Sequence, residues 1–362
     1  MKTLRLTMIL VLLSAVVYAG KFTVDNTPGS GANFSSVGSA ISSASSGDKL
    51  YLHPSSFTYG DFSLNKSLVF IGPVHLPEYN GGVGAQIDIV TLQNGSSGSK
   101  FIGLKIETIT CAVFHQVHNI EITNNYLYNT VVIQGPYGDY SDGDNWLIQG
   151  NVMIQKEGCG GCKFIDIRSS AGVNSGWIFR NNIIQSVTSN NTVWMFGNFN
   201  GSTIAENNII IHRNSHPLFN SSVSGGEFRN NIFWASDASF SDLTINGSEV
   251  LFDYNLTYHS SGVLTALPGA NNIDNTDPEF EYLTDDIPDW NYENIYMLSE
   301  TSPGSGAGSD GTDMGVYGAL YPFRMEGYPQ DFPRFRSVSV SNTIVPQGQT
   351  IQIHLNAVRA GL

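Results

Sequence analysis

The amino-acid sequence predicts an all-β parallel β-helix, a solenoid of short strands and turns, and three observations indicate this fold. The first is a phrase of apolar residues around an Asn pair, whose second Asn falls at positions 125, 151, 182, 208, 231 and 255. The second is the spacing of these positions, 26, 31, 26, 23 and 24 residues, because self-similarity at such a period is typical of solenoids. The third is the short apolar, partly β-branched runs that flank each Asn pair, which indicate strands and not helices.

The Asn pair itself is predicted to be the bend between two strands. Asn tolerates the left-handed backbone conformation, and its side chain bonds nearby backbone groups. About 25 residues hold three short strands and three turns, so each repeat is one coil, and neighbouring coils lie about 4.8 Å apart. We expect the second Asn of each coil to lie above the last one, with amides that bond along the stack. These residues are therefore expected to shape the fold and to carry no chemistry.

Residues 1–19 are predicted to be a signal peptide. Lys2 and Arg5 precede an apolar run at 6–17, and small residues stand at the usual cleavage positions in 17–19. The run is too short to favour a membrane span, and polar sequence follows it. We expect a mature chain that begins near Gly20, is secreted or held at the cell surface, and does not insert into a membrane after cleavage.

The charge of the chain restricts its partners. The formal net charge is −14, and removal of Lys2 and Arg5 with the signal peptide lowers it to −16. Nucleic acids and anionic membranes are therefore poor partners. Polyanionic sugars would also be repelled unless a bound cation or a local basic patch intervenes. Only 13% of the residues are charged, which suits a hydrated β surface in the extracellular space.

Residues 20–75 are predicted to be the N-terminal cap and the first strands. A helix near residues 34–45 is expected because its apolar positions follow one helical face: Phe34, Val37, Ala40, Ile41 and Ala44. Strand-like sequence follows at 50–52 and 67–73. An uncapped solenoid end exposes core and unpaired strand edges, so a capping helix has a clear physical purpose.

The sequence after this helix resembles a known family. The amphipathic helix, the stretch GDKLYLHP at 47–54 and the stretch FTYG at 57–60 resemble the opening of secreted proteins of the pectin-lyase-like superfamily. The resemblance implies a right-handed β-helix whose open N-terminal end is plugged by the helix, and this hand agrees with the general preference for right-handed crossovers. It also implies that sugars bind on the sheet formed by the strands that lie between successive Asn pairs.

Residues 76–321 are predicted to form the parallel β-helix, with 271–321 as its closing end. The strands between successive Asn pairs are expected at 113–116, 131–135, 164–169, 193–198, 218–221 and 243–247. Alternation along a strand places one set of side chains inward, namely Phe114, Ile133, Ile167, Phe196, Phe219 and Ile245. The residues that follow them are expected to point outward, namely His115, Gln134, Arg168, Gly197, Asn220 and Asn246.

Residues 322–362 are predicted to be a Pro-rich linker and a short β extension. The segments 335–341 and 350–357 alternate like a β pair around Pro346-Gln347-Gly348. Such a hairpin is too short to be an independent domain, so it is expected to lie along the solenoid or to bind a surface partner.

The three cysteines indicate no metal site. Cys159 and Cys162 form a single CxxC with no second pair to complete a zinc site, and a local disulfide that pinches one turn is expected for them in a secreted chain. Cys111 is expected to be a buried free thiol at the start of a strand.

The predicted catalytic residues are Arg168, Lys163 and His115. Asp166 and Arg168 alternate with apolar residues and are therefore expected to face solvent on one strand, and stacking is expected to place Gln134 below Arg168. A basic residue beside carboxylates is what β-elimination of a uronic-acid polysaccharide requires. A cation or Arg neutralises the sugar carboxylate, and a Lys, Arg or His then removes the α proton.

An acidic, aromatic loop at 135–144 is predicted to complete this site. Asp139, Asp142 and Asp144 alternate with Gly and Ser in a way that suits Ca²⁺ ligands. The residues predicted to bind substrate are Gln134, Tyr137, Tyr140 and Asp166. The alternative for the loop is a solvated surface with an ordinary ion pair, which is worth little.

Two classes of function stay open at this point. In one, the protein binds and cleaves an extracellular polysaccharide by Ca²⁺-assisted β-elimination. In the other, it is a non-catalytic surface or matrix protein that binds glycans or adheres through a flat β face. Fold alone cannot choose between them.

Overall fold

The computed structural model describes residues 19–73, 75, 76, 82–129, 133, 134, 142–155, 163–167, 174–188, 194–325, 327, 333–340, 348 and 350–359. The predicted signal peptide, apart from Ala19, lies outside these residues, and so do Cys159 and Cys162. Within the described part of the chain, no helix has the length and apolar character needed to cross a bilayer.

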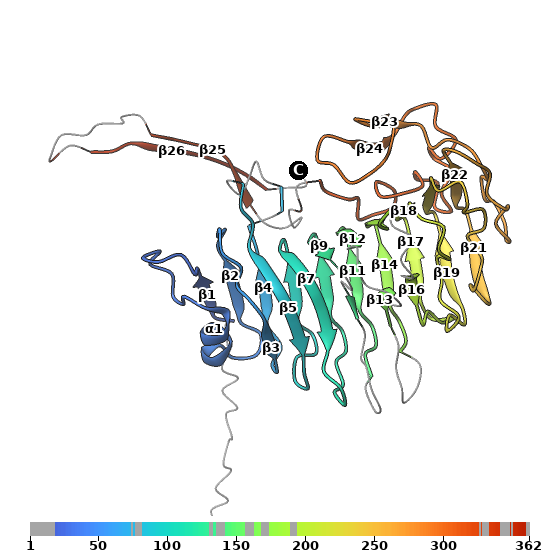
Figure 1. Cartoon of the computed structure of the whole chain (residues 1–362). Coiled ribbons are helices and arrows are strands. Elements are labelled where there is room, and N and C mark those ends of the chain that lie inside the picture. Colours follow the sequence, from blue (N-terminus) through green and yellow to red (C-terminus); the bar gives the residue numbers. More distant parts are fainter. Residues whose placement is uncertain are drawn as a thin grey trace, which may run out of the picture.

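The chain folds into a parallel β-helix made of two long parallel sheets, which confirms the predicted fold class (Figure 1). The first sheet contains β1 (Lys21–Val24), β2 (Lys49–Leu52), β4 (Val69–Ile71), β6 (Lys100–Ile102), β8 (Glu121–Thr123), β11 (Leu147–Gln149), β14 (Ile178–Arg180), β17 (Ile204–Glu206), β19 (Gly226–Arg229) and β21 (Val250–Asp253). The second contains β3 (Phe62–Leu64), β5 (Gln86–Leu92), β7 (Lys105–Cys111), β9 (Tyr126–Asn129), β10 (Ile133–Gln134), β12 (Val152–Gln155), β13 (Lys163–Asp166), β15 (Ile183–Gln185), β16 (Trp194–Gly197), β18 (Ile209–His212), β20 (Ile232–Ala235) and β22 (Leu256–His259).

Coils in the middle of the solenoid present three faces, because the second sheet divides in two there. The start of β7 pairs with β9 through Lys105 and Tyr126, and its end pairs with β10 through Ile109 and Ile133. In β5 and β7 one strand therefore serves two faces, whereas the next coils use two strands, β9 with β10, β12 with β13 and β15 with β16. The division matches the three short strands per coil that the sequence period predicts.

The Asn ladder is present as predicted. The backbone N–H and the side-chain amide of Asn182 both donate to Oδ1 of Asn208, each at 3.0 Å, and Asn208 repeats this pattern towards Asn231. All six second Asn residues are fully buried. The first residue of a pair takes the left-handed conformation, with φ of +53° at Asn181 and +56° at Asn230. The first residue of each pair therefore makes the turn, and the second forms the ladder.

The interior of the solenoid is apolar and stacked. Residues at equivalent coil positions lie above one another, so aromatic rings form columns, such as Trp146 on Trp177 with centroids 4.4 Å apart. Trp146 and Trp177 are fully buried, and their indole N–H groups donate to the backbone of the preceding coil. Burial of rings of this size contributes strongly to stability.

The N-terminal cap is also confirmed. Helix α1 (Val37–Ser43) begins after Ser36, whose side-chain oxygen accepts from the backbone N–H of Ser39 at 3.2 Å. Its buried face consists of Val37, Ala40 and Ile41, which join the end of the solenoid core. The helix lies at the N-terminal end of the solenoid in Figure 1.

Residues 278–323, here named the strap, differ from the expected closing coils. They turn back and cover the outer face of the second sheet, where they include the antiparallel strands β23 (Phe280–Tyr282) and β24 (Ile295–Leu298) (Figure 1). A second hydrophobic core forms between sheet and strap, which includes Ile183, Ile209, Ile232, Tyr296, Met314 and Val316. The physical reason is that the outward positions of these strands are aliphatic and must be covered.

The first residues of the Asn pairs fasten the strap to the solenoid. The side-chain amide of Asn181 donates to the carbonyl oxygens of Val316 and Gly318 at 2.9 and 3.0 Å. Oδ1 of Asn230 accepts from the backbone N–H of Ser309 at 2.8 Å. The Asn pair therefore has a second structural purpose that the turn chemistry did not predict.

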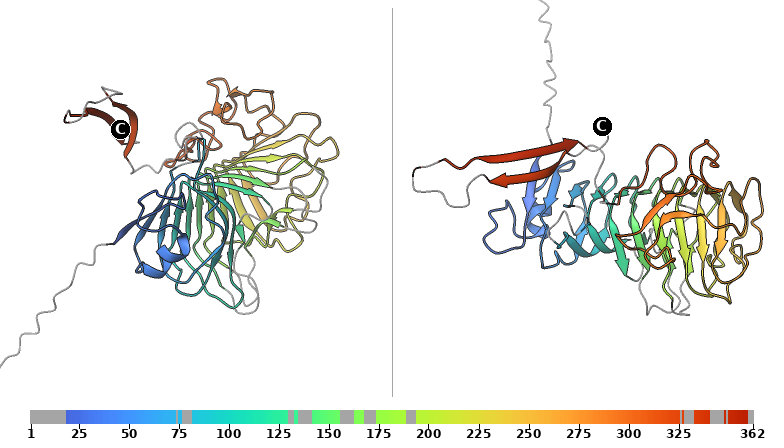
Figure 2. Two further views of the ribbon diagram at one scale, coloured as in Figure 1. Left: turned by 60° about the vertical axis from the view of Figure 1, so that its left-hand side comes forward. Right: turned by 90° about the horizontal axis from the view of Figure 1, so that it is seen from above.

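The C-terminal extension is an antiparallel hairpin of β25 (Pro333–Val340) and β26 (Ile353–Arg359), which confirms the expected β pair. Figures 1 and 2 show that it stands away from the coils of the solenoid. Ile351, Ile353 and Leu355 are exposed on it.

Some of the predicted orientations are wrong. Ile167, Phe196 and Phe219 are buried as expected, but Phe114 is 60% exposed and Ile245 is 45% exposed. The reason is that β7 ends at Cys111, so 113–116 is a corner and not a strand, and 243–247 is a turn. Cys111 is a buried free thiol as predicted, although it ends a strand.

Candidate functional site

The structure describes only part of the predicted sugar-binding site. Arg168, Tyr137, Tyr140 and Asp139 lie outside the described residues, and of Gln134 and Lys163 only the backbone is described. The members that can be placed fully are His115, Asp142, Asp144 and Asp166.

Asp166 does not face solvent, which corrects the prediction. Its side chain is 2% exposed, and Oδ1 accepts from the side-chain amide of Asn198 on the next coil at 2.5 Å. Asn198 has φ of +57°, so this left-handed turn brings its amide to the carboxylate. The strand register places Gln134 beside Asp166, whereas stacking was expected to place it below Arg168, which lies outside the described residues. The carboxylate thus helps to join two coils.

His115 lies at a corner after β7 and not on an outward strand position. Its Nδ1 accepts from the backbone N–H of Asn94 at 2.8 Å, and the side-chain oxygen of Asn94 accepts from the N–H of Gln116 at 2.7 Å. Because Nδ1 is occupied as an acceptor, the neutral ring carries its proton on Nε2. In this arrangement Nδ1 of His115 already accepts from the Asn94 N–H, so only Nε2 is left to contact a ligand.

Asp144 also serves the junction between coils. Its Oδ1 accepts from the backbone N–H and the hydroxyl of Ser175 at 2.7 and 2.8 Å, and its Oδ2 lies 3.5 Å from Nδ1 of His118. Asp142 lies nearby, with Oδ2 3.4 Å from the amide nitrogen of Gln116. Among the residues that can be described, no three His, Cys, Asp or Glu side chains gather to hold a metal ion. The predicted Ca²⁺ site includes Asp139, outside the described residues, and stays a prediction.

A better-defined group lies on the outer face of β7 and β9. We name it the tyrosine patch: Tyr126 and Tyr128, with Lys105 between their rings and with Asp88 and Glu107 nearby. The two tyrosines are two residues apart on one strand and therefore share a face. Their ring centroids lie 6.0 Å apart, and Nζ of Lys105 lies 5.6 Å from each centroid. All five side chains are half-buried.

The electrostatics of the patch favour neutral phenols. Burial first, and then the charges of Asp88 and Glu107 and the neighbouring Tyr126, raise the pKa of Tyr128. Burial also raises the pKa of Tyr126. At neutral pH both hydroxyls therefore keep their protons and can donate hydrogen bonds, but they are poor bases.

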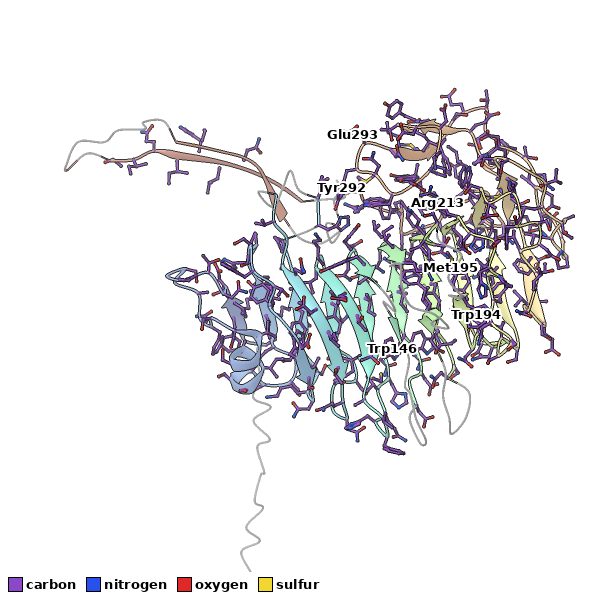
Figure 3. All side chains as sticks on the ribbon, in the orientation of Figure 1. Trp146, Trp194, Met195, Arg213, Tyr292 and Glu293 are labelled. Carbon is purple, nitrogen blue, oxygen red and sulfur yellow. The ribbon has the colours of Figure 1, made fainter. Side chains whose placement is uncertain are left out.

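One edge of the patch contacts the strap. The ring of Tyr126 lies 6.0 Å from His75 and 6.5 Å from Trp290 between centroids, and the Tyr292 hydroxyl donates to the His75 carbonyl oxygen at 2.8 Å. Figure 3 shows Tyr292 at the end of the strap that faces the N-terminal coils. Burial, and then the charge of Lys105, lower the pKa of His75 to about 3, so this histidine is neutral.

The sequence contained a signal for this patch. Lys105 and Glu107 alternate around the buried Ile106, and Tyr126 and Tyr128 alternate around the buried Leu127. These residues belong to strands that directly follow the Gly or Asn turn, whereas the prediction looked at the strands between successive pairs. Comparison with known protein families and with curated proteins finds no match for this chain. Its function must therefore be inferred from these surfaces.

Proposed function

We propose that this protein binds an extracellular polysaccharide through the tyrosine patch and does not cleave it. The observation that carries the proposal is the pair of half-buried tyrosine rings that share Lys105 on one sheet face. The predicted signal peptide and the resemblance of residues 47–60 to the pectin-lyase-like superfamily support an extracellular glycan as ligand.

The geometry suits a sugar chain. Aromatic rings stack on the apolar faces of pyranose rings and keep a polar tip for hydroxyl groups. The rings of Tyr126 and Tyr128 lie on one strand with centroids 6.0 Å apart, which is on the scale of one sugar residue. Lys105 can donate to sugar oxygens, while the carboxylates of Asp88 and Glu107 can accept from sugar hydroxyls.

The protonation states favour binding over catalysis. β-Elimination needs a base near the α proton of the sugar. The pKa values of Tyr126 and Tyr128 are raised, so neither phenol gives up its proton readily. His75 is neutral but buried beneath the patch, where Tyr292 contacts its Nδ1 at 3.2 Å. The tyrosines and His75 are thus suited to holding a bound chain and not to removing a proton from it.

The test is a binding screen of immobilised neutral and uronic polysaccharides. Tyr128→Ala and Lys105→Met should each weaken binding to the best ligand about tenfold, the scale of one lost stacking or charged contact. Lys100→Met is the matched control, because Lys100 pairs with Glu121 at 2.8 Å on the other sheet and is similarly exposed. Equal loss in the control variant, with unchanged melting temperatures, would rule out the patch.

The second candidate function is Ca²⁺-assisted cleavage of a uronic-acid polymer at the site predicted around Arg168. The strand register pairs Gln134 with Asp166, so the strands that carry this site are adjacent, although the Asp166 carboxylate itself is buried. Incubation with polyuronates, with and without Ca²⁺, should be followed by ultraviolet absorbance of unsaturated products. Ca²⁺-dependent product that Arg168→Lys abolishes would establish the lyase and refute the purely binding function.

A further inference from the structure

A cleft lies at the other end of the same sheet, between the outer face of β20 and β22 and the strap. Its volume is about 520 Å³. One wall carries Trp234 and Tyr258, which are register partners on neighbouring strands, and the opposite wall carries Phe280. The rim contains Asp277, Glu281 and Asp286, together with Glu279, and no lining residue is basic.

The sequence around the cleft adds to its negative charge. Residues 230–323 contain no Lys or Arg, although they hold 15 of the 31 acidic residues of the chain. The nearest arginines before this stretch are already paired. Arg213 forms an ion pair with Asp289, and Arg229 bonds Glu206 and Glu227, each at 2.7 Å. The cleft therefore has a negative potential, because residues 230–323 supply no Lys or Arg and the nearest arginines before them are paired with other carboxylates.

The carboxylates of the cleft differ in whether they already accept hydrogen bonds from the protein. Glu279 accepts from the hydroxyls of Ser299 and Thr301 at 3.2 and 2.7 Å, so it holds the strap together. Asp277 accepts a hydrogen bond from the hydroxyl of Tyr258. Burial, and then the charge of Asp277, raise the pKa of Tyr258. Glu281 and Asp286 are exposed at the rim. The arrangement combines aromatic faces with carboxylates, which is the chemistry that attracts an organic cation.

We propose that this cleft binds a chain of protonated amino sugars, as a site separate from the tyrosine patch. The half-buried rings of Tyr258 and Phe280 offer apolar surfaces for the pyranose faces, whereas Trp234 lines the cleft but is only 3% exposed. Asp277, Glu281 and Asp286 can accept hydrogen bonds from the ammonium groups, and charge-assisted bonds of this kind are stronger than neutral ones. The acetylated form of the same sugar has no charge and lacks this attraction.

The experiment is calorimetric titration of the full chain with a glucosamine hexamer and with an N-acetylglucosamine hexamer, at a mildly acidic pH where the amine is protonated. The charged hexamer should bind at least tenfold more tightly than the acetylated one. Binding should weaken with added salt, because exposed charges are screened. Equal affinity for both hexamers would overturn the proposal.

Substitutions at the rim of the cleft test whether the amino sugars bind there. The double change Glu281→Gln with Asp286→Asn should weaken binding of the glucosamine hexamer about tenfold or more. Asp285→Asn is the matched control, since Asp285 is exposed beside Asp286 but does not line the cleft. Equal loss in the control would mean that the overall negative charge attracts the ligand and would refute a specific site.

Two further measurements separate this cleft from the tyrosine patch and recognition of the sugar rings from recognition of charge alone. Tyr128→Ala in the tyrosine patch should leave glucosamine binding unchanged, so failure of the proposed function and failure of this inference can be told apart. A lysine hexapeptide carries the same charge without pyranose rings. If it binds as tightly as the glucosamine hexamer, the aromatic walls contribute nothing to recognition and the amino-sugar proposal is wrong.

Discussion

Replacing Asn208 with Ala should destabilise the protein strongly, because Asn208 lies in the middle of the buried ladder. Its Oδ1 accepts from the backbone N–H and the side-chain amide of Asn182, and its amide donates to the Phe179 carbonyl and to Asn231. The variant keeps none of these bonds and leaves the buried N–H of Asn182 without a partner. An unsatisfied buried group costs about 1–3 kcal/mol, so with the lost amide bonds we expect a decrease of about 3 kcal/mol in the free energy of unfolding.

The end of the same ladder supplies the control. Asn272 accepts from the N–H and the amide of Asn255 and donates to the Phe252 carbonyl at 2.8 Å, but it is half-exposed. Water can replace its bonds, so Asn272→Ala should cost only about 1 kcal/mol. Urea unfolding followed by Trp fluorescence measures both changes from the shift in midpoint at constant slope. Equal losses at the two positions, or a loss below about 1 kcal/mol at Asn208, would refute the reasoning.

Two further predictions concern the strap and pH. A Cβ at Gly318 would clash with the carbonyl oxygen of Asp313, so Gly318→Ala should loosen the strap, and limited proteolysis should cut residues 278–323 faster than in the parent protein. Burial lowers the pKa of His75 to about 3 and that of His212 to about 4, so the unfolded chain takes up these protons first as pH falls below about 6.5. Stability is therefore full above pH 6.5, and each histidine should cost up to about 2 kcal/mol at pH 5 in urea titrations, a loss that His212→Gln should reduce.

The fold could be predicted because the same local sequence pattern recurs in every coil of the body of the solenoid. The Asn pairs fix a turn and a ladder in every coil, and the same buried environment recurs at Asn125, Asn182 and Asn231. The strap could not be predicted in this way, because its contacts do not repeat. A signal was nevertheless present: Ile209, Ile210 and Ile211 are consecutive apolar residues, and all three are buried. A strand that is apolar at successive positions must be covered on both faces.

Some predicted orientations around the site were wrong because alternation was extended into corners. His115 and Phe114 were assigned to a strand, but Phe114 has φ of +66° and lies in a turn, so the in-and-out order of a strand does not apply. Asp166 does lie on a strand, yet the left-handed turn at Asn198 buries its carboxylate. Neither effect is visible in a period of two, because each depends on a turn that follows a strand.

The outward residues of the second sheet explain why both proposed binding surfaces lie at its ends. Along one row of register partners, the outward side chain changes from Lys105 and Tyr126 to Val152, Ile183, Ile209, Ile232 and Leu256. The strap covers the aliphatic middle, because burial of apolar area is favourable wherever it is available. In the adjacent row the aromatic residues Tyr128, Trp234 and Tyr258 stand at the two ends. The strap buries Trp234 but leaves Tyr128 and Tyr258 half-exposed, so one aromatic surface lies at Tyr126 and Tyr128 and another lies at Tyr258 and Phe280. The same segment that stabilises the sheet thus determines where a ligand can reach it.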